Sequence, residues 1–304
     1  MDKIVIILLV IICIFATIGL YSLITLIISI IFFTKKSKAV SYTWLNHLGC
    51  GQKSCKPIVQ PLLYPNQISP NNYKKDIATY CADLVIRLDP KRTTSNKNDV
   101  KLPTDLSLKL KILNKPGDPL FGILCDGNKD NTAWLIYRGT ANLQEWIQDF
   151  TYNQVTYKDW GLIHEGFWNI YNNNRANILS QLQKMNPKKV IVSGHSLGGG
   201  VAILTGVDLH LSGYDVEIYT FASPRVGNVD YCNKVNSVGP NIYRIVNTVD
   251  IVPTVPFGTV PNFNEYNKPW FYSDCGEVHP FTNNMKSIIN NHVMANYSTN
   301  IPLK

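Results

Sequence analysis

The sequence contains one motif whose residue types and spacing suit nucleophilic catalysis. From Ile191 onward it reads I-V-S-G-H-S-L-G-G-G, so a run of apolar residues leads into the pattern Gly-x-Ser-x-Gly. A serine on a very tight turn between a strand and a helix needs neighbours that lack a Cβ atom, and Gly194 and Gly198 meet that need. The motif therefore predicts that Ser196 is a nucleophile.

Two elements must position this serine. Residues 190–192 are β-branched, which predicts a buried parallel strand before it. Residues 197–211 are rich in valine and leucine, which predicts a helix packed on a sheet after it. The N-terminus of such a helix directs N–H groups without intrahelical partners at any negative charge that develops beside Ser196.

A serine hydroxyl also needs a base to take its proton and a carboxylate to orient that base. Asp250 stands out among the acids because it follows an apolar strand predicted at residues 242–246 and precedes I-V-P-T-V-P, whose prolines predict a loop. Catalytic acids of α/β sheets lie on loops at strand ends. The histidines that follow Ser196 are His210, His279 and His292.

Five blocks of the sequence extend the pattern around the motif serine. They are Y-R-G-T at 137–140 with W-I-Q-D at 146–149, H-E-G-F at 164–167, G-H-S-L-G-G at 194–199, T-F-A-S-P-R-V-G-N at 220–228 and N-T-V-D-I-V-P-T-V-P at 247–256. These blocks resemble those of the class 3, or fungal-type, triacylglycerol lipases, and they occur in family order. The resemblance implies an α/β-hydrolase fold, with a mostly parallel central sheet and helices on both faces. It also implies hydrolysis of lipid esters.

The resemblance assigns a triad of Ser196 as nucleophile, Asp250 as acid and His292 as base. Relatives often have aspartate immediately before that histidine, whereas this chain has Asn291. His279, in G-E-V-H-P-F, is the rival base. His292 is favoured because it lies near the end of an apolar C-terminal segment and is followed by Tyr297, as in relatives. The other histidines are expected to be structural or surface residues.

Acyl transfer further requires donors aimed at the oxyanion of the tetrahedral intermediate. The resemblance implies two of them. One is the backbone N–H of Leu197, and the other is Thr140, through its N–H and its hydroxyl. Asp149 is expected to hold Thr140 in place.

A short amphipathic helix is predicted beside this oxyanion segment. Its apolar residues recur at positions i, i+3, i+4 and i+7 and are separated by polar residues. They are Leu143, Trp146, Ile147 and Phe150. Most such helices pack on a core, but beside an oxyanion loop this one is predicted to be a lid that covers the site in water and turns onto a lipid surface.

Residues 4–34 form a second large feature because they carry no charged side chain. As one helix they would be about 45 Å long, against a hydrocarbon core of about 30 Å, so a single span fits and two do not. The run is longer than the apolar region of about 7–15 residues in a cleavable signal peptide. We expect an uncleaved single-pass anchor in residues 1–38 and a hydrolase domain in residues 39–304.

The charges that flank this segment bear on its orientation. Lys35, Lys36 and Lys38 follow it, whereas Lys3 and the amino terminus precede it, beside an aspartate. The positive-inside tendency therefore weakly favours a cytoplasmic hydrolase domain.

The cysteines do not decide whether the hydrolase domain lies in an oxidising or a reducing compartment. Six lie outside the apolar run, an even number that could pair outside the cytosol: Cys50, Cys55, Cys81, Cys125, Cys232 and Cys275. Fungal relatives tie an early cysteine to one at the extreme C-terminus, for which no cysteine after Cys275 is available. That absence fits a reducing compartment or a different pairing, and Cys50 and Cys55 are the only candidate pair close in the sequence. The single sequon, Asn296-Tyr297-Ser298, is too little to indicate secretion.

Composition limits the remaining possibilities. The residues after the anchor suffice for one large α/β domain, with an amphipathic helix predicted at 73–84 and an exposed loop at 92–99. The net charge of +8 suits contact with anionic lipid headgroups. No aromatic-basic pattern indicates nucleic acid, and no metal-ligand spacing or phosphate loop is present, so no cofactor or metal is expected. No protein partner can be inferred.

These features together predict a membrane-anchored carboxylic ester hydrolase that acts on lipid esters of the triacylglycerol type. A phospholipase A1 or a diacylglycerol lipase would use the same residues, and so would a carbohydrate-ester hydrolase. An inactive, membrane-bound lipid-binding or scaffold protein is the alternative from another class. Headgroup, acyl length, oligomeric state and biological role are left open.

Overall fold

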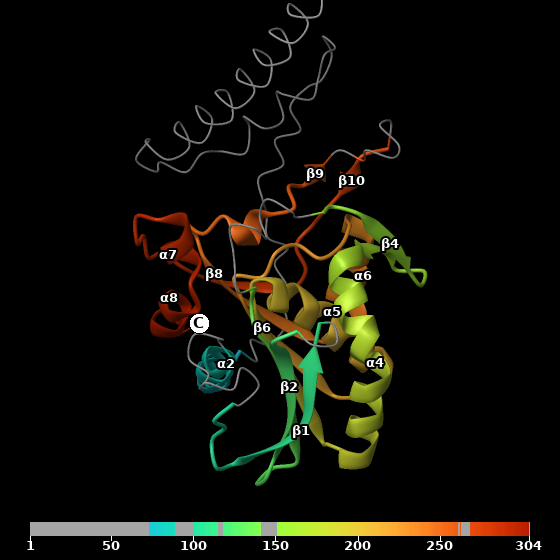
Figure 1. Ribbon diagram of the computed structural model, residues 1–304. Helices are drawn as coiled ribbons and strands as arrows, with labels where there is room; N and C mark the ends of the chain where they lie inside the picture. Colours follow the sequence, from blue (N-terminus) through green and yellow to red (C-terminus); the bar gives the residue numbers. More distant parts are fainter. Residues whose placement is uncertain are drawn as a thin grey trace, which may run out of the picture. The chain divides into compact units, whose positions relative to one another are not determined.

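A seven-stranded sheet lies at the centre of the structure, a computed structural model that describes residues 73–88, 100–114, 118–140, 151–260, 262 and 268–303 (Figure 1). The strands are ordered β1-β2-β3-β6-β7-β8-β11. β1 and β2 pair antiparallel, as do β2 and β3, and every later pair is parallel. The strands are β1 Leu106–Leu113, β2 Leu120–Gly127, β3 Thr132–Tyr137, β6 Lys189–His195, β7 Val216–Phe221, β8 Asn241–Asn247 and β11 Glu277–Phe281.

Helices cover both faces of this sheet, and each face has its own hydrophobic core. α4 and α5 pack on one face, while α2 and α8 pack together on the other. The expected α/β-hydrolase-like arrangement is therefore confirmed for the described residues. The helices are α2 Lys75–Arg87, α4 Glu165–Met185, α5 Leu197–Leu211, α6 Val229–Val238, the 3-10 turn η2 Val252–Thr254, α7 Ile288–His292 and α8 Met294–Thr299.

Two small antiparallel ladders lie outside the central sheet. One pairs β4 with β5, and the other pairs β9 with β10. Their bounds are β4 Gln154–Tyr157, β5 Gly161–His164, β9 Thr259–Val260 and β10 Trp270–Phe271.

The strand and helix predicted around the motif serine are both present. The β-branched run lies in β6, which is buried almost throughout, and the predicted helix is α5, in which residues 198–209 are all buried. The apolar strand predicted before Asp250 is β8. The helix predicted at 73–84 is α2, although it begins later and ends at Arg87.

Three sequence predictions fall outside the described residues and stay predictions. They are the apolar segment 4–34, the amphipathic segment 141–150 and the exposed loop 92–99. Among the helices that the structure does describe, none combines the length and the apolar character needed to span a bilayer.

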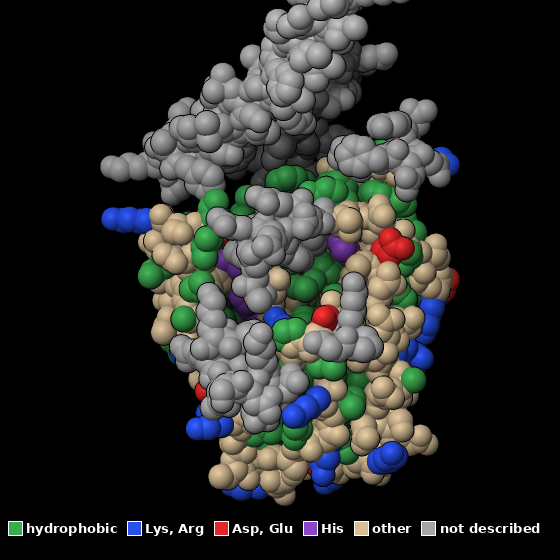
Figure 2. Space-filling view, viewed as in Figure 1, with side chains coloured by type: hydrophobic (Ala, Val, Ile, Leu, Met, Phe, Trp, Pro, Cys, Tyr) green, Lys and Arg blue, Asp and Glu red, His purple; other side chains and the backbone are tan. Residues whose placement is uncertain are grey.

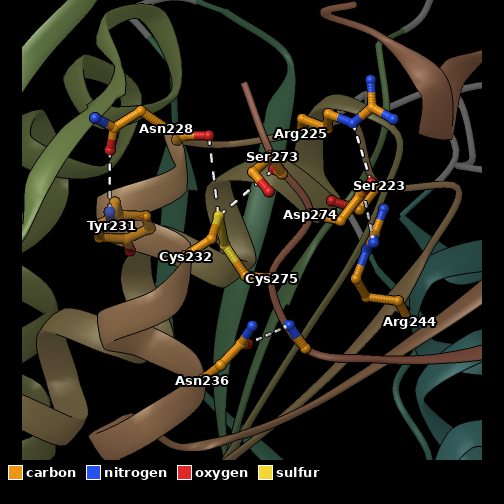
Figure 3. The surroundings of a disulfide bond; sticks show 12 residues. Ser223, Arg225, Asn228, Tyr231, Cys232, Asn236, Arg244, Ser273, Asp274 and Cys275 are labelled. Atoms are coloured by element: carbon orange, nitrogen blue, oxygen red, sulfur yellow. Dashed lines mark hydrogen bonds and ion pairs between the residues drawn. A yellow bond between two sulfur atoms is a disulfide. The ribbon is translucent and has the colours of Figure 1, made fainter. Parts of the chain in front are cut away.

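Cys232 in α6 is joined by a disulfide to Cys275, which lies just before β11 (Figure 3). This is one of the other pairings that the sequence left open, and it does not involve Cys50 and Cys55, the pair close in sequence, which lies outside the described ranges. The reason is topological: α6 precedes β8, and β11 pairs parallel with β8, so the two cysteines meet across 43 residues. The spacing of these two cysteines in the sequence does not indicate that they are in contact.

We expect the disulfide to stabilise the fold substantially. Closing a loop of this length lowers the entropy of the unfolded chain, which corresponds to about 4 kcal/mol in the loop-closure model. Replacing both Cys232 and Cys275 with serine should therefore lower the free energy of unfolding by roughly 2–4 kcal/mol in urea denaturation. Reductant should shift the wild type toward the variant. Equal stability of wild type and variant would contradict this expectation.

Candidate active site

Ser196 lies at the junction of β6 and α5, in a strained backbone conformation. Its φ is 56° and its ψ −127°, a region that residues with a Cβ rarely adopt. Two backbone hydrogen bonds hold the turn. The Ser196 N–H donates to the Phe221 carbonyl at the end of β7 (2.9 Å), and the Ser196 carbonyl accepts from the Gly199 N–H (2.8 Å). The serine is thus fixed by the neighbouring strand as well as by its own helix.

The two motif glycines are needed for steric reasons, as the sequence predicts. A Cβ atom on Gly194 would collide with the backbone of Gly198. A Cβ atom on Gly198 would in turn collide with the carbonyl of Arg138, and would lie only 2.9 Å from the carbonyl oxygen of Tyr137. The absence of both Cβ atoms lets the turn close on itself and lets α5 approach the end of β3.

The structure brings Ser196, His292 and Asp250 into one hydrogen-bonded chain. His292 Nε2 lies 2.8 Å from Ser196 Oγ, and His292 Nδ1 lies 2.7 Å from Asp250 Oδ2. All three side chains are buried. Because an ionised carboxylate can only accept, Nδ1 carries the proton and Nε2 is left to accept from the serine hydroxyl. This arrangement can withdraw a proton from Ser196.

The rival histidine occupies another place. His279 lies in β11, where its Nε2 is 3.3 Å from Glu277 Oε1 and its ring stacks on Tyr73 with centroids 3.9 Å apart. Of the two histidines left open by the sequence, His292 is the one that contacts the serine.

Asp250 is fully engaged by donors. Tyr297 donates its hydroxyl to Oδ2 (2.7 Å), and the backbone N–H of Val252 donates to Oδ1 (3.0 Å). Burial alone would raise the pKa of Asp250, but His292 and these hydrogen bonds outweigh it, so that the pKa lies below the ordinary 3.8. Burial also holds the pKa of the Tyr297 hydroxyl well above 10. Tyr297 therefore remains a donor, a role that the sequence did not reveal.

The segment predicted to supply an oxyanion donor packs directly on this turn. A Cβ atom on Gly139 would lie 3.2 Å from Ser196 Cβ, so the Arg138-Gly139-Thr140 segment touches the serine turn. Arg138 fixes the segment, because its Nε donates to the Leu120 carbonyl (2.6 Å) and its Nη1 to the Gly139 carbonyl (2.7 Å). Thr140 is half-buried, and Asp149, its expected partner, lies outside the described residues.

The second predicted donor lies at the helix N-terminus. Leu197 is the first residue of α5 and directly follows Ser196. The first N–H groups of a helix have no intrahelical carbonyl to bind, and they carry the positive end of the helix dipole. Such a group can stabilise a negative charge that forms on an atom bound to Ser196.

Arg225 anchors the C-terminal end of the loop that carries Asp250. Its Nη1 donates to the carbonyls of Thr254 (2.8 Å) and Pro256 (3.0 Å), while its Nε donates to Asp274 (3.1 Å). Arg244 reaches the same carboxylate at 2.8 Å, so Asp274 lies between two guanidinium groups next to the disulfide (Figure 3). Burial would raise the pKa of Asp274, but the two arginines lower it overall.

The remaining described histidines act as structural donors and acceptors. His195 Nε2 lies 2.8 Å from the His292 carbonyl, and burial together with the nearby His292 lowers the pKa of His195 to about 3. His164 begins α4 by accepting from the Phe167 N–H, and burial lowers its pKa to about 4. His210 contacts the Val238 carbonyl. Within the described ranges, no group of three or more His, Cys, Asp or Glu side chains could hold a metal ion.

Comparison with known proteins gives a consistent result. A family model described as lipase (class 3) matches residues 134–260. A lipase from Rhizomucor miehei is 36% identical over 154 residues, which cover 46% of this chain and 42% of that protein. A secreted mono- and diacylglycerol lipase A from Penicillium cyclopium is 32% identical over 142 residues, 44% of this chain and 46% of its own length. The chain thus matches less than half the length of these curated relatives.

Structural similarity extends further along the chain. The Rhizomucor miehei lipase in its native propeptide complex superimposes with a TM-score of 0.57 and 26% sequence identity, over 68% of this chain and 68% of that one. The region that the family model matches contains most of β3, the serine turn and the Asp250 loop. Residues 134–260 of this chain are therefore similar to the class 3 lipases, and the chain has an α/β-hydrolase-like fold.

Proposed function

We propose that this chain is a serine esterase that hydrolyses acyl esters of lipids, with Ser196 as nucleophile, His292 as base and Asp250 as the acid that orients the base. The observation that carries the proposal is the continuous hydrogen-bonded chain from Asp250 through His292 to Ser196. A scaffold protein would have no need for a buried carboxylate, a buried imidazole and a strained serine in this order. The relatives, named as lipases, support the same reaction.

In the proposed mechanism, His292 takes the proton of Ser196 as its Oγ attacks the ester carbonyl. The resulting oxyanion receives hydrogen bonds from the Leu197 N–H and from Thr140. Collapse of this intermediate breaks the bond to the alcohol, which leaves with the proton held by His292. A water molecule, activated by the same histidine, then releases the fatty acid and restores the Ser196 hydroxyl. Asp250 stays ionised throughout and stabilises the imidazolium.

Exposed apolar side chains beside the triad support a lipid rather than a small soluble ester. Ile251 directly follows Asp250 and Val293 directly follows His292, and both are more than a third exposed. Phe257 and Ile289, which lie within seven residues of Asp250 and His292 in the sequence, are exposed as well. Figure 2 shows hydrophobic side chains gathered on one face, next to histidines. Such a surface is suited to contact with an ester held in a lipid phase.

The predicted lid and anchor belong to the same proposal. Residues 141–150 would cover the site in water, and residues 4–34 would keep the enzyme at the bilayer that contains its substrate. The disulfide between Cys232 and Cys275 favours an oxidising compartment. Because a few flanking lysines bias orientation only weakly, we propose that the hydrolase domain lies on the non-cytosolic side of its membrane.

Removing the Ser196 hydroxyl should abolish the activity. We expect Ser196→Ala to lower ester hydrolysis roughly 10³-fold or more, because the nucleophile itself is lost. The measurement is fatty-acid release from triacylglycerol, diacylglycerol, phospholipid and a short soluble ester, each in detergent. Preference within this panel identifies the headgroup class. Equal turnover by wild type and variant, or no reaction of the wild type with a fluorophosphonate, would favour the inactive lipid-binding alternative.

Removing the Tyr297 hydroxyl should weaken the support of Asp250. We expect Tyr297→Phe to lower the free energy of unfolding by about 1–3 kcal/mol at pH 7, as for a hydrogen bond to a charged group. The pKa of folded Asp250 lies below its unfolded value, so this stabilisation is present above the unfolded pKa and is lost as the pH falls through the folded one. The gap between variant and wild type should therefore shrink below pH 3.8.

Urea denaturation across the acid range measures this gap. Tyr214→Phe serves as the matched control, since Tyr214 is half-buried outside the site and should show no such pH dependence. A Tyr297→Phe effect that is the same at every pH would rule out the interaction with the ionised carboxylate.

The side of the membrane can be tested directly. A C-terminal epitope tag on the full chain, translated into sealed microsomes, should resist added protease until detergent opens the vesicles. Digestion of the tag without detergent would instead place the domain in the cytosol, as the flanking lysines predict. A tagged cytosolic-side membrane protein in the same preparation confirms that the protease is active.

A further inference from the structure

Four asparagines form a buried or half-buried hydrogen-bonded cluster behind the triad. They come from the end of β8, from the loop after β11, from α7 and from α8. Asn247 Nδ2 donates to the carbonyls of Asn283 (3.0 Å) and Asn291 (3.1 Å), and Asn247 Oδ1 accepts from the Asn283 N–H (3.1 Å). Asn296 Nδ2 donates to the Asn291 carbonyl (3.1 Å), and Asn296 Oδ1 accepts from Asn283 Nδ2 (2.7 Å). The cluster therefore converges on Asn291.

Asn291 links the loop that carries the acid to the helix α7 that carries the base. Its Nδ2 donates to the Val249 carbonyl (3.2 Å), and Val249 immediately precedes Asp250. Asn291 itself immediately precedes His292 and is only 7% exposed. Its Oδ1 accepts from the Met285 N–H (2.7 Å), which ties in the segment that leads to α7. One amide thus joins the residue before the acid to the residue before the base.

We propose that Asn291 is a positioning residue that sets the spacing between Asp250 and His292. This inference rests on the proposed function, since it concerns the same triad. The two backbone groups that bind the Asn291 side chain need opposite partners. The Val249 carbonyl needs a hydrogen-bond donor, and the Met285 N–H needs an acceptor. The asparagine amide carries a donor and an acceptor on one short side chain and so satisfies both partners at once.

A carboxylate at this position would be nearly the same shape but would lack the donor. It would keep the contact with the Met285 N–H and would place a second negative charge against the Val249 carbonyl, close to Asp250. Relief of that repulsion requires the Asp250 loop to move away from α7. Because small misplacements of catalytic groups lower rates steeply, the change should appear in the chemical step rather than in substrate binding.

The test compares Asn291→Asp and Asn291→Ala with the same substitutions at Asn290. Asn290 is the preceding residue of the same helix, is exposed, and makes no side-chain hydrogen bond to the four described asparagines of the cluster, so Asn290→Asp and Asn290→Ala should behave like wild type. Reactive serines are counted by fluorophosphonate titration of the full-length chain in detergent. The values of kcat per reactive serine and of KM are then measured on the best ester of the panel.

We expect Asn291→Asp and Asn291→Ala to lower kcat per reactive serine about tenfold or more, with KM within about twofold of wild type. The alanine variant keeps the result interpretable if the buried carboxylate prevents folding. Wild-type kcat in both variants, or a loss that appears only as fewer reactive serines or as a higher KM, would overturn the positioning role. Absence of any reactive serine in the wild type would instead refute the proposed function.

Discussion

The hydrogen bond between His292 Nδ1 and Asp250 Oδ2 joins the last residue of α7 to a loop residue 42 positions earlier in the sequence, and it directs the imidazole toward Ser196. Burying a carboxylate is costly unless hydrogen bonds replace its water. Here His292, Tyr297 and the Val252 N–H replace it, and the pKa of Asp250 falls below 3.8. Because the acid stays ionised, the Nδ1 proton stays on the ring and Nε2 remains an acceptor. The proposed chemistry depends on this order of protons.

Two residues with a strained backbone follow strands of the central sheet, and the neighbouring strand holds each of them by a hydrogen bond. Ser196 after β6 and Ala222 after β7 both have positive φ, 56° and 53°, which costs on the order of 1–3 kcal/mol each. The Ser196 N–H donates to the Phe221 carbonyl, and the Ala222 N–H donates to the Ile245 carbonyl. Each strained residue is therefore bound to the next parallel strand. The sheet holds the serine in a conformation that an isolated turn would not keep.

Local features of the site could be predicted from the sequence, and long-range ones could not. The turn at Ser196 is specified within a few residues, because its glycines, its strand and its helix all act on the same stretch of chain. The disulfide between Cys232 and Cys275 depends on the pairing of β8 with β11, which no local pattern encodes. The role of Tyr297 was hidden for the same reason, since it contacts Asp250 only once α8 has packed.

Family resemblance supplied part of what local patterns could not. Residue types alone left three histidines as candidates for the base. The resemblance around His292 favoured this histidine, which is the one that contacts Ser196. The same resemblance drew attention to Asn291 only as a departure from the usual aspartate. Its contacts with Val249 and Met285 show why an amide suits this chain, because one partner needs a donor and the other an acceptor.

The loop that carries Asp250 is held at both ends by side chains from elsewhere in the fold. Asn291 binds the carbonyl of Val249 at its start, and Arg225 binds the carbonyls of Thr254 and Pro256 at its end. Arg225 is in turn held by Asp274, next to the disulfide. Between these two ends the turn η2 holds the loop by its own hydrogen bonds, from the Thr254 N–H to the Ile251 carbonyl and from the Val255 N–H to the Val252 carbonyl. Asp250 is therefore positioned both by this turn and by the contacts of the loop with α7 and with the disulfide segment.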